Sequence, residues 1–410
     1  MDEKKQAQVT EDAAQEAEQP KTQKKKKQKK VKKPPSKLRQ LVNRVVALIV
    51  TVILVLGAVY LVVNRDKLNV DALRRAFAYR TSSGEEADVY SYDAAPSGVF
   101  AQLDGGILVA SETGFQLVAR NGETALEQAV AMEQPVISTA GTYAAVYDAG
   151  GTTLYLIHNQ SIVRTYAPPK NQALLAARVS DNGYLTVVEQ ASGYKAAVTV
   201  YDADGNPVIT ENISSSFVSD AILSPDGKTL AVVSVGEDTS GFNSALIFFN
   251  ISDGSERTRF VLGSDVVLDL DWEKNTLWVA GEYGIYCIEK DTMTASAVDN
   301  SRYLQSFSLG GDGFAAMFYT NHQGGSAGSL TLLDDQGAER SYGINEEVLD
   351  ISAAGDYVAV LTGNELTIYK SDLSVYAVTA NSWGARRVLM REDGSALLVT
   401  NESASLYLPE

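Results

Sequence analysis

Short apolar segments recur along most of this chain at a nearly constant interval, and this recurrence constrains the fold more than any other feature. From about residue 86 onward, eight such segments start 37 to 47 residues after one another, with Gly, Asp, Asn and Ser clusters between them. Asp-Gly pairs precede several of them, as expected where a tight hairpin requires positive φ. A unit of about forty residues with four short strands is typical of a β-propeller. The segments are Gly106–Ser111, Tyr143–Tyr147, Tyr184–Val188, Leu230–Ser234, Leu277–Gly281, Phe314–Phe318, Tyr357–Leu361 and Ala396–Thr400.

The two ends of the repeat region predict how the ring closes. The last unit, Ala385–Leu408, has only three strands, and an isolated strand, Asp88–Tyr92, precedes the first unit. If the early strand completes the final unit, no sheet edge remains exposed there. We therefore expect an all-β fold, a β-propeller of eight blades over residues 86–410, with seven blades as the alternative. A β-sandwich array does not account for the single regular period.

One hairpin carries a family resemblance. The segment Ser224–Ser234, SPDGKTLAVVS, resembles the inner hairpin of WD-repeat-like and YVTN-type bacterial propellers. The other units match it loosely, and the Trp-Asp pair of true WD repeats is missing. The whole chain is similar to single-pass, membrane-anchored propeller proteins on the surface of Gram-positive bacteria, whose function is uncharacterised. This resemblance implies a fold and a topology but no catalytic residues, because a fold alone does not define a function.

A membrane span precedes the repeats. Val45–Val63 is a run of 19 residues without a charge, and at about 1.5 Å per helical residue it matches the roughly 30 Å hydrocarbon core of a bilayer. Residues 24–44 hold eleven Lys and Arg, against five in residues 64–80. This asymmetry predicts a cytoplasmic N-terminus and an extracytoplasmic propeller. The long charged lead and the lack of a small-x-small site favour an uncleaved signal-anchor over a cleavable signal peptide.

The segments on either side of the span differ in character. Residues 1–44 carry 14 basic and 6 acidic side chains, lack an apolar face and are predicted to be a disordered cytoplasmic tail. Their Lys-rich run is expected to attract anionic lipid headgroups; no nucleic acid is expected, because no aromatic stacking partners are interleaved with it. Residues 64–85 are predicted to be a stalk with a short helix, capped by Asn69 or Asp71, that lies on the bilayer or docks on the propeller.

The sequence offers little for catalysis. One Cys and two His exclude a disulfide framework and a Cys-based zinc finger, and we assign no catalytic residue, metal or cofactor. Gly324–Gly328 matches G-x-S-x-G without the helix that a nucleophile elbow requires, and the segment after Asp202 lacks the Gly and Glu of a calcium loop. Asp269 and Asp271 alternate with leucines, so both carboxylates face one side of a strand at the channel or rim. Cys287 is expected to be a buried small hydrophobe.

Three units have lengthened connections between their second and third strands, namely Gln190–Lys195, Val235–Asn243 and Thr320–Gly328. Connections of this kind all project from one face of the disc, and insertions on one face of a repeat protein often form a binding surface. Harmless loop drift is an equally good explanation. The candidate ligand-binding residues on these connections are Tyr194, Glu237, Asp238, Phe242, Asn321 and His322.

These observations favour a membrane-tethered binding or scaffold module for a surface protein, a peptide or a cell-wall polymer. The part of the chain after residue 44 has 21 basic and 45 acidic residues, so it should prefer cationic partners. One alternative is a hydrolase or lyase that acts on glycans or peptides through carboxylates at the channel, with Asp269 and Asp271 as the first suspects. Another is a surface sensor whose basic tail reports to the cytoplasm.

Overall fold

The computed structural model describes a part of the chain that consists almost entirely of β-structure. It describes residues 89–93, 98–169, 172–239, 241–295, 302–382 and 384–409, and before these Val46, Thr51, Asp71 and Arg75, which have helical backbone. The chain divides into two units, Met1–Leu68 and Asn69–Glu410. The predicted tail, span and stalk otherwise lie outside the described residues. Among the residues described, no helix is both long and apolar enough to cross a membrane.

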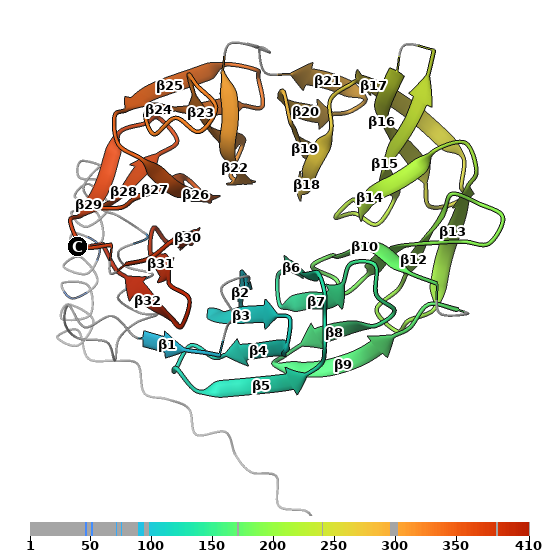
Figure 1. Ribbon diagram of the computed structural model, residues 1–410, viewed down its shortest axis with the longest axis horizontal. Helices are drawn as coiled ribbons and strands as arrows, with labels where there is room; N and C mark the ends of the chain where they lie inside the picture. The colour runs from blue at the N-terminus through green and yellow to red at the C-terminus, as the bar shows by residue number, and fades with distance from the viewer. Residues whose placement is uncertain are drawn as a thin grey trace, which may run out of the picture. The chain divides into compact units, whose positions relative to one another are not determined.

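The second unit contains eight four-stranded antiparallel sheets arranged as the blades of a ring (Figure 1). Within each blade the strands are named here from the centre of the ring outward. Blade 1 consists of β2 (Val99–Leu103), β3 (Gly106–Ser111), β4 (Gly114–Val118) and β5 (Thr124–Ala129), and blade 2 of β6 (Pro135–Ala140), β7 (Tyr143–Asp148), β8 (Leu154–His158) and β9 (Ser161–Tyr166). Blade 3 consists of β10 (Leu174–Val179), β11 (Leu185–Glu189), β12 (Ala196–Tyr201) and β13 (Pro207–Ile213), and blade 4 of β14 (Phe217–Leu223), β15 (Thr229–Asp238), β16 (Gly241–Asn250) and β17 (Glu256–Gly263).

The remaining four blades repeat the same order from the centre outward. Blade 5 consists of β18 (Val267–Glu273), β19 (Thr276–Gly281), β20 (Ile285–Glu289) and β21 (Thr292–Ala295), and blade 6 of β22 (Tyr303–Gly311), β23 (Phe314–Thr320), β24 (Gly328–Asp334) and β25 (Glu339–Ile344). Blade 7 consists of β26 (Val348–Ala354), β27 (Tyr357–Thr362), β28 (Leu366–Lys370) and β29 (Val375–Thr379), and blade 8 of β30 (Arg387–Met390), β31 (Ala396–Val399), β32 (Ser403–Tyr407) and β1 (Val89–Ser91).

Blade 8 closes the ring with strands from both ends of the propeller sequence. The first strand, β1, pairs antiparallel with the last, β32, with Val89 opposite Ser405 and Ser91 opposite Ser403. The three strands before it, β30 to β32, supply the rest of the blade. This confirms the predicted eight-bladed propeller and its mode of closure, and rules out seven blades.

Burial explains why the second strand of each unit was the clearest signal in the sequence. The second and third strands have sheets packed against both faces, so β3, β23 and β27 are buried at every position. The outermost strands have one face in water; β13 alternates between exposed and half-buried residues, as a half-buried strand does. Eight apolar clusters, each shared by two neighbouring blades, form the core around the ring.

Serines on the innermost strands add polar links between blades. Ser138 accepts a hydrogen bond from the N–H of Val179 at 3.2 Å, and Ser308 accepts one from Ala353 at 2.8 Å. Ser352 accepts one from Met390 at 3.0 Å. In each case the donor lies on the innermost strand of the next blade, so these contacts fix how adjacent blades stand around the channel.

Candidate functional site

The blades present two different faces to solvent. The inner-turn face carries the hairpins that join the first strand of each blade to the second. Neighbouring hairpins of this face contact one another: Arg391 Nη2 donates to the carbonyl of Gly105 at 2.8 Å, and Gly313 N donates to Glu273 Oε2 at 2.6 Å. The opposite, long-hairpin face carries the hairpins that join second strands to third, because successive turns of an antiparallel sheet alternate between its ends.

All the ligand-binding residues predicted from the sequence lie on the long-hairpin face. Tyr194 lies between β11 and β12, with 49% of its surface exposed, and Phe242 lies on β16, with 42% exposed. Glu237 is exposed on β15, where Asp238 follows it in the backbone. Asn321 and His322 are exposed between β23 and β24.

The structure changes the description of one of these connections. Val235–Asn243 was predicted as an extended loop, but β15 and β16 continue through it as a paired hairpin, with Val235 opposite Ser244 and Glu237 opposite Phe242. Backbone pairing therefore holds this projection in a regular ladder that rises beyond the rest of blade 4.

The three long connections belong to blades 3, 4 and 6 and do not form a single cluster. Blade 5 lies between the last two and has only three residues, Glu282 to Gly284, between β19 and β20. A pocket of about 550 Å³ lies at this end of blade 5, where it meets blade 6. Sequence reasoning missed its residues; the only signal was a tyrosine at a strand-connecting turn and another at the start of an inner strand. The pocket is lined by Leu262, Ser264, Asp265, Glu282, Tyr283, Tyr286, Arg302, Tyr303, Leu304 and Tyr319.

The motifs judged structural in the sequence occupy structural positions. Gly324–Gly328 lies between β23 and β24 with no helix after it. Asp202 caps a hairpin turn by accepting the N–H of Asn206 at 2.8 Å. Cys287 is buried on β20, and burial, with nearby carboxylates, raises the pKa of its thiol to about 12, so it is a poor nucleophile.

A second cavity, of about 770 Å³, lies at the centre of the ring, at the inner-turn end of the channel. Asp269 and Asp271 both line it, as their alternation along β18 predicted. Inner-strand and inner-turn residues of several blades form the remaining walls, among them Gln102, Thr139, Ser308, Ser352 and Met390.

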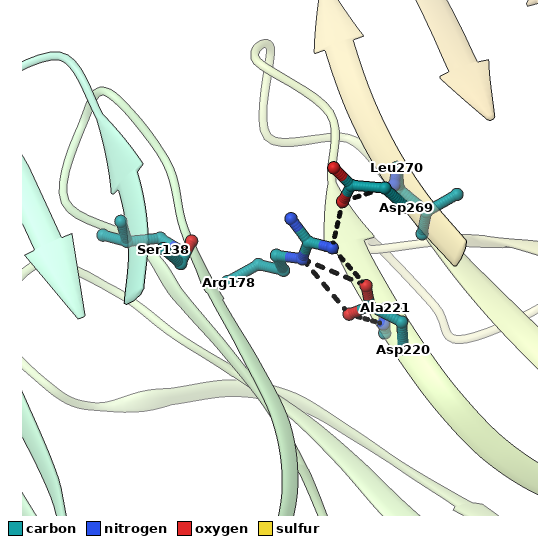
Figure 2. Close-up of polar contacts among 7 residues, drawn as sticks. Ser138, Arg178, Asp220, Ala221, Asp269 and Leu270 are labelled. Carbon is teal, nitrogen blue, oxygen red and sulfur yellow. Dashed lines mark hydrogen bonds and ion pairs between the residues drawn. The ribbon is translucent and has the colours of Figure 1, made fainter. Parts of the chain in front are cut away.

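Arg178 joins three blades at this cavity (Figure 2). Its guanidinium reaches from β10 in blade 3, and Nη2 lies 2.5 Å from Asp220 Oδ2 on β14 and 2.6 Å from Asp269 Oδ1 on β18. Nε donates to Asp220 Oδ2 at 3.0 Å. Burial disfavours the charged guanidinium, but the two carboxylates outweigh this effect and raise the pKa of Arg178.

A shared backbone irregularity aims the two carboxylates. β14 and β18 each shift register at the same point, immediately before Asp220 and Asp269. Each carboxylate then accepts the N–H of the following residue, from Ala221 at 2.8 Å and from Leu270 at 2.9 Å. Sequence reasoning found Asp269 but missed Arg178, whose only signal was a lone cation in the apolar strand LLAARV.

Asp271 is the second carboxyl group that β18 brings to this cavity. Burial and then the charge of Asp269 raise the pKa of Asp271 to about 7, against the opposing effect of Arg178. At neutral pH the Asp271 carboxyl group is therefore partly protonated. Among the residues described, no group of three or more His, Cys, Asp or Glu side chains is arranged to hold a metal ion.

Two residues from the predicted stalk contact the inner-turn face. Asp71 Oδ2 accepts a hydrogen bond from the hydroxyl of Tyr357 at 2.7 Å. Arg75, only 5% exposed, donates to the carbonyls of Asp393 and Pro409 and lies over the ring of Tyr376. Arg75 follows Asp71 by four positions, so one face of a helix carries both. The segment is therefore anchored where blade 7 meets the closing blade 8.

The comparisons with known proteins place the chain in a family without assigning it an activity. Residues 80–401 match DUF5711, a family of unknown function, and the chain belongs to this family. No curated protein matches the sequence. The match covers the whole ring up to the last blade, so it agrees with a single propeller domain.

Solved structures resemble the chain in fold only. Saccharomyces cerevisiae Sqt1 is 10% identical, with a TM-score of 0.57 over 80% of this chain and 100% of that one. The C-terminal WD40 domain of Sif2 is 11% identical, with a TM-score of 0.53 over 80% and 98%. Matches extend to 935 chains, so the fold is too widespread to select a function.

Proposed function

We propose that this protein is a membrane-tethered, extracytoplasmic propeller that binds a surface protein, a peptide or a cell-wall polymer through its long-hairpin face, without catalysing a reaction. One observation carries the proposal. Asp71 and Arg75 occupy the inner-turn face, so the incoming chain leaves the long hairpins free at the opposite end. A rigid ring with one face committed to its tether and projections on the other is suited to binding.

In this proposal the tether is the uncharged run that ends at Val63, eight residues before Asp71. The Lys-rich tail would lie in the cytoplasm against anionic headgroups. The resemblance to Gram-positive surface proteins agrees with a partner in or near the cell wall.

Charge suggests the chemistry of the partner and the kinetics of binding. The acidic excess of the chain beyond residue 44 would speed association with a cationic partner, and added salt would slow it. An association rate that does not change with ionic strength would argue against electrostatic steering.

Site-specific photocrosslinking of the full-length protein in its native membrane tests the binding face. A photoreactive residue at Phe242 probes the long-hairpin face, and one at Lys228, an exposed residue on the inner-turn side of the same blade, is the matched control. We expect one partner to be captured from position 242 and not from 228. Capture of the same partner from both positions, or from 228 alone, would contradict the assigned face.

A labelling experiment tests the topology separately. Because Cys287 is buried, the variants Tyr194→Cys and Lys27→Cys each carry one reactive thiol. A membrane-impermeant maleimide added to intact cells should label position 194 and spare position 27 until the cells are lysed. Labelling of position 27 in intact cells would reverse the proposed orientation.

A second candidate function rests on the channel. Asp271, with a pKa raised to about 7, lines the same cavity as Asp269, which is paired with Arg178, and a carboxyl group with a pKa near neutral pH is suited to general acid–base catalysis. Turnover of cell-wall fragments by the full-length protein that is lost in both Asp271→Asn and Asp269→Asn would support a hydrolase or lyase. No turnover by the unmodified protein would remove this candidate.

A further inference from the structure

The pocket between blades 5 and 6 has the composition of a carbohydrate-binding site. We propose that it binds a neutral oligosaccharide, an inference that rests on the proposed binding function and names its ligand class and its site. Tyr283 and Tyr303 supply half-exposed rings, with 50% and 47% of their surfaces in solvent. Its volume of about 550 Å³ falls within the roughly 300–1,000 Å³ of small-molecule sites.

A buried carboxylate fixes one wall of the pocket. Asp265, only 4% exposed, accepts the hydroxyl of Tyr286 at 2.6 Å and the N–H of Tyr283 at 3.0 Å. The hydroxyl of Ser244 donates to its carbonyl. A Cβ at Gly281 would lie 2.3 Å from Asp265 Oδ2, so only glycine leaves room for this carboxylate. These contacts hold the turn that presents the Tyr283 ring, so its position does not depend on a ligand.

The other wall carries a cation held in place by an aromatic ring. The guanidinium of Arg302 lies 4.7 Å from the ring centroid of Tyr319, and Tyr303 follows it at the start of β22. The hydroxyl of Tyr319 donates to the sulfur of Met317 at 3.0 Å, which fixes that ring from behind. Arg302 thus offers hydrogen-bond donors from a preorganised position.

These groups match the two surfaces of a pyranose ring. Tyrosine combines a large apolar ring with a polar tip at low entropic cost, and the apolar C–H face of a sugar can pack on such a ring. The hydroxyl groups around a sugar need both donors and acceptors. Arg302 supplies donors, Glu282 supplies acceptors and Ser264 supplies either.

The charges of the lining favour a neutral ligand. Arg302 is the one cation among the pocket's lining residues, against the carboxylates of Asp265 and Glu282. A phosphate-bearing polymer would meet a net negative lining. A sugar without charge satisfies the hydrogen-bonding groups of the pocket without that repulsion.

The position of the pocket agrees with a ligand longer than one sugar. It lies beside the short connection of blade 5, between the paired hairpin of blade 4, which extends to Asp238 and Gly241, and the connection of blade 6, which spans Thr320–Gly328. The two projections flank the pocket, so a chain that enters it can also contact them.

Titration of the full-length protein in detergent with soluble tetrasaccharides tests the inference, with saturation-transfer NMR and calorimetry as the readouts. The probes are cellotetraose, xylotetraose and chitotetraose, with tetragalacturonate as the charged counterpart. We expect at least one neutral probe to bind at millimolar or lower concentration and tetragalacturonate to bind at least about tenfold more weakly. Failure of all three neutral probes to bind at several millimolar, or tighter binding of tetragalacturonate, would overturn the inference.

Variants locate the site. Tyr283→Ala and Tyr303→Ala should each weaken binding of the neutral probe by about tenfold or more, whereas Tyr283→Phe, which keeps the ring, should retain most of it. Tyr342→Ala removes a tyrosine of similar exposure on the outer strand β25 and should leave binding unchanged. Arg302→Gln tests the opposite wall independently and should weaken binding. Unchanged binding in Tyr283→Ala, Tyr303→Ala and Arg302→Gln would overturn the site.

Sugar binding at this pocket and partner binding by the long-hairpin face can fail independently of one another. A partner protein without glycan that is captured from Phe242 would overturn the sugar ligand and leave the binding module standing. Sugar binding that depends on Tyr283 would support the inference even if no protein were captured from that position.

Discussion

The variant Asp271→Asn should make the stability of the propeller less dependent on pH. Burial, followed by the charge of Asp269, raises the pKa of Asp271 from 3.8 to about 7. The folded protein therefore keeps a proton that the unfolded chain releases above pH 4. The stability associated with that proton is fully present below pH 3.8 and is lost as the pH rises to about 7.

The structure gives the size of this effect. A difference of about three pH units, at 1.36 kcal/mol per unit, corresponds to about 4 kcal/mol lost between pH 4 and pH 7. Asparagine keeps a similar shape and cannot ionise. The free energy of unfolding of the Asn variant, relative to that of the unmodified protein, should thus grow by about 3 kcal/mol between pH 5 and pH 8. The reason is that the pKa of Asp271 in the folded protein, about 7, lies about two pH units above pH 5.

Urea unfolding of the full-length protein in detergent, followed by near-ultraviolet circular dichroism at pH 5 and pH 8, measures this difference. Comparison with the unmodified protein at each pH cancels the other titrating groups, which both proteins share. As a control, Asp269→Asn removes the charge that raises the pKa of Asp271 and should reduce the pH dependence. An equal effect of Asp271→Asn on the free energy of unfolding at both pH values would refute the reasoning.

Three further predictions follow from the buried polar groups. Arg75→Ala removes a charged donor to two carbonyls and should lower the free energy of unfolding by about 3 kcal/mol, with faster hydrogen exchange in blades 7 and 8; unchanged exchange there would contradict the docking. Arg178→Ala leaves Asp220 and Asp269 without their cation and should lower the free energy of unfolding by about 2–3 kcal/mol at pH 7; an unchanged free energy of unfolding would contradict the ion-pair assignment. Cys287, buried and with a thiol pKa raised to about 12, should resist iodoacetamide at pH 8 until urea unfolds the chain, and rapid labelling of the native protein would show that the blade opens.

The fold was predictable from the sequence because its signals are local and repeated. The second strands are largely buried on both faces and are therefore mostly apolar, as in Phe314–Thr320, and hairpin residues mark the boundaries at regular intervals. The closing strand was predictable by counting, since a three-stranded last unit leaves one place for Asp88–Tyr92. Alternation along β18 likewise placed Asp269 and Asp271 on one side.

The sites were less predictable because they depend on how the blades stand side by side. Arg178 lies 91 residues before Asp269 in the chain, and no local pattern links them. The pocket of Tyr283 and Tyr303 is lined by residues of blades 4, 5 and 6, and Asp265, which holds its turn in place, lies on the connection before blade 5. The long-hairpin face was predictable because strand order alone determines which turns share an end.

The affinity of the partner captured from Phe242 for two forms of the full-length protein tests the central claim most directly. In one form the hairpin is intact; in the other, Asn-Gly replaces Gly236–Asn243, so that the turn closes directly on the Val235–Ser244 pair and the rest of blade 4 keeps its register. If the long-hairpin face is the binding surface, the shortened form should bind at least about tenfold more weakly, while Lys228→Ala on the inner-turn side should bind like the unmodified protein. Equal affinity of the intact and shortened forms, with loss of binding in Lys228→Ala, would contradict it.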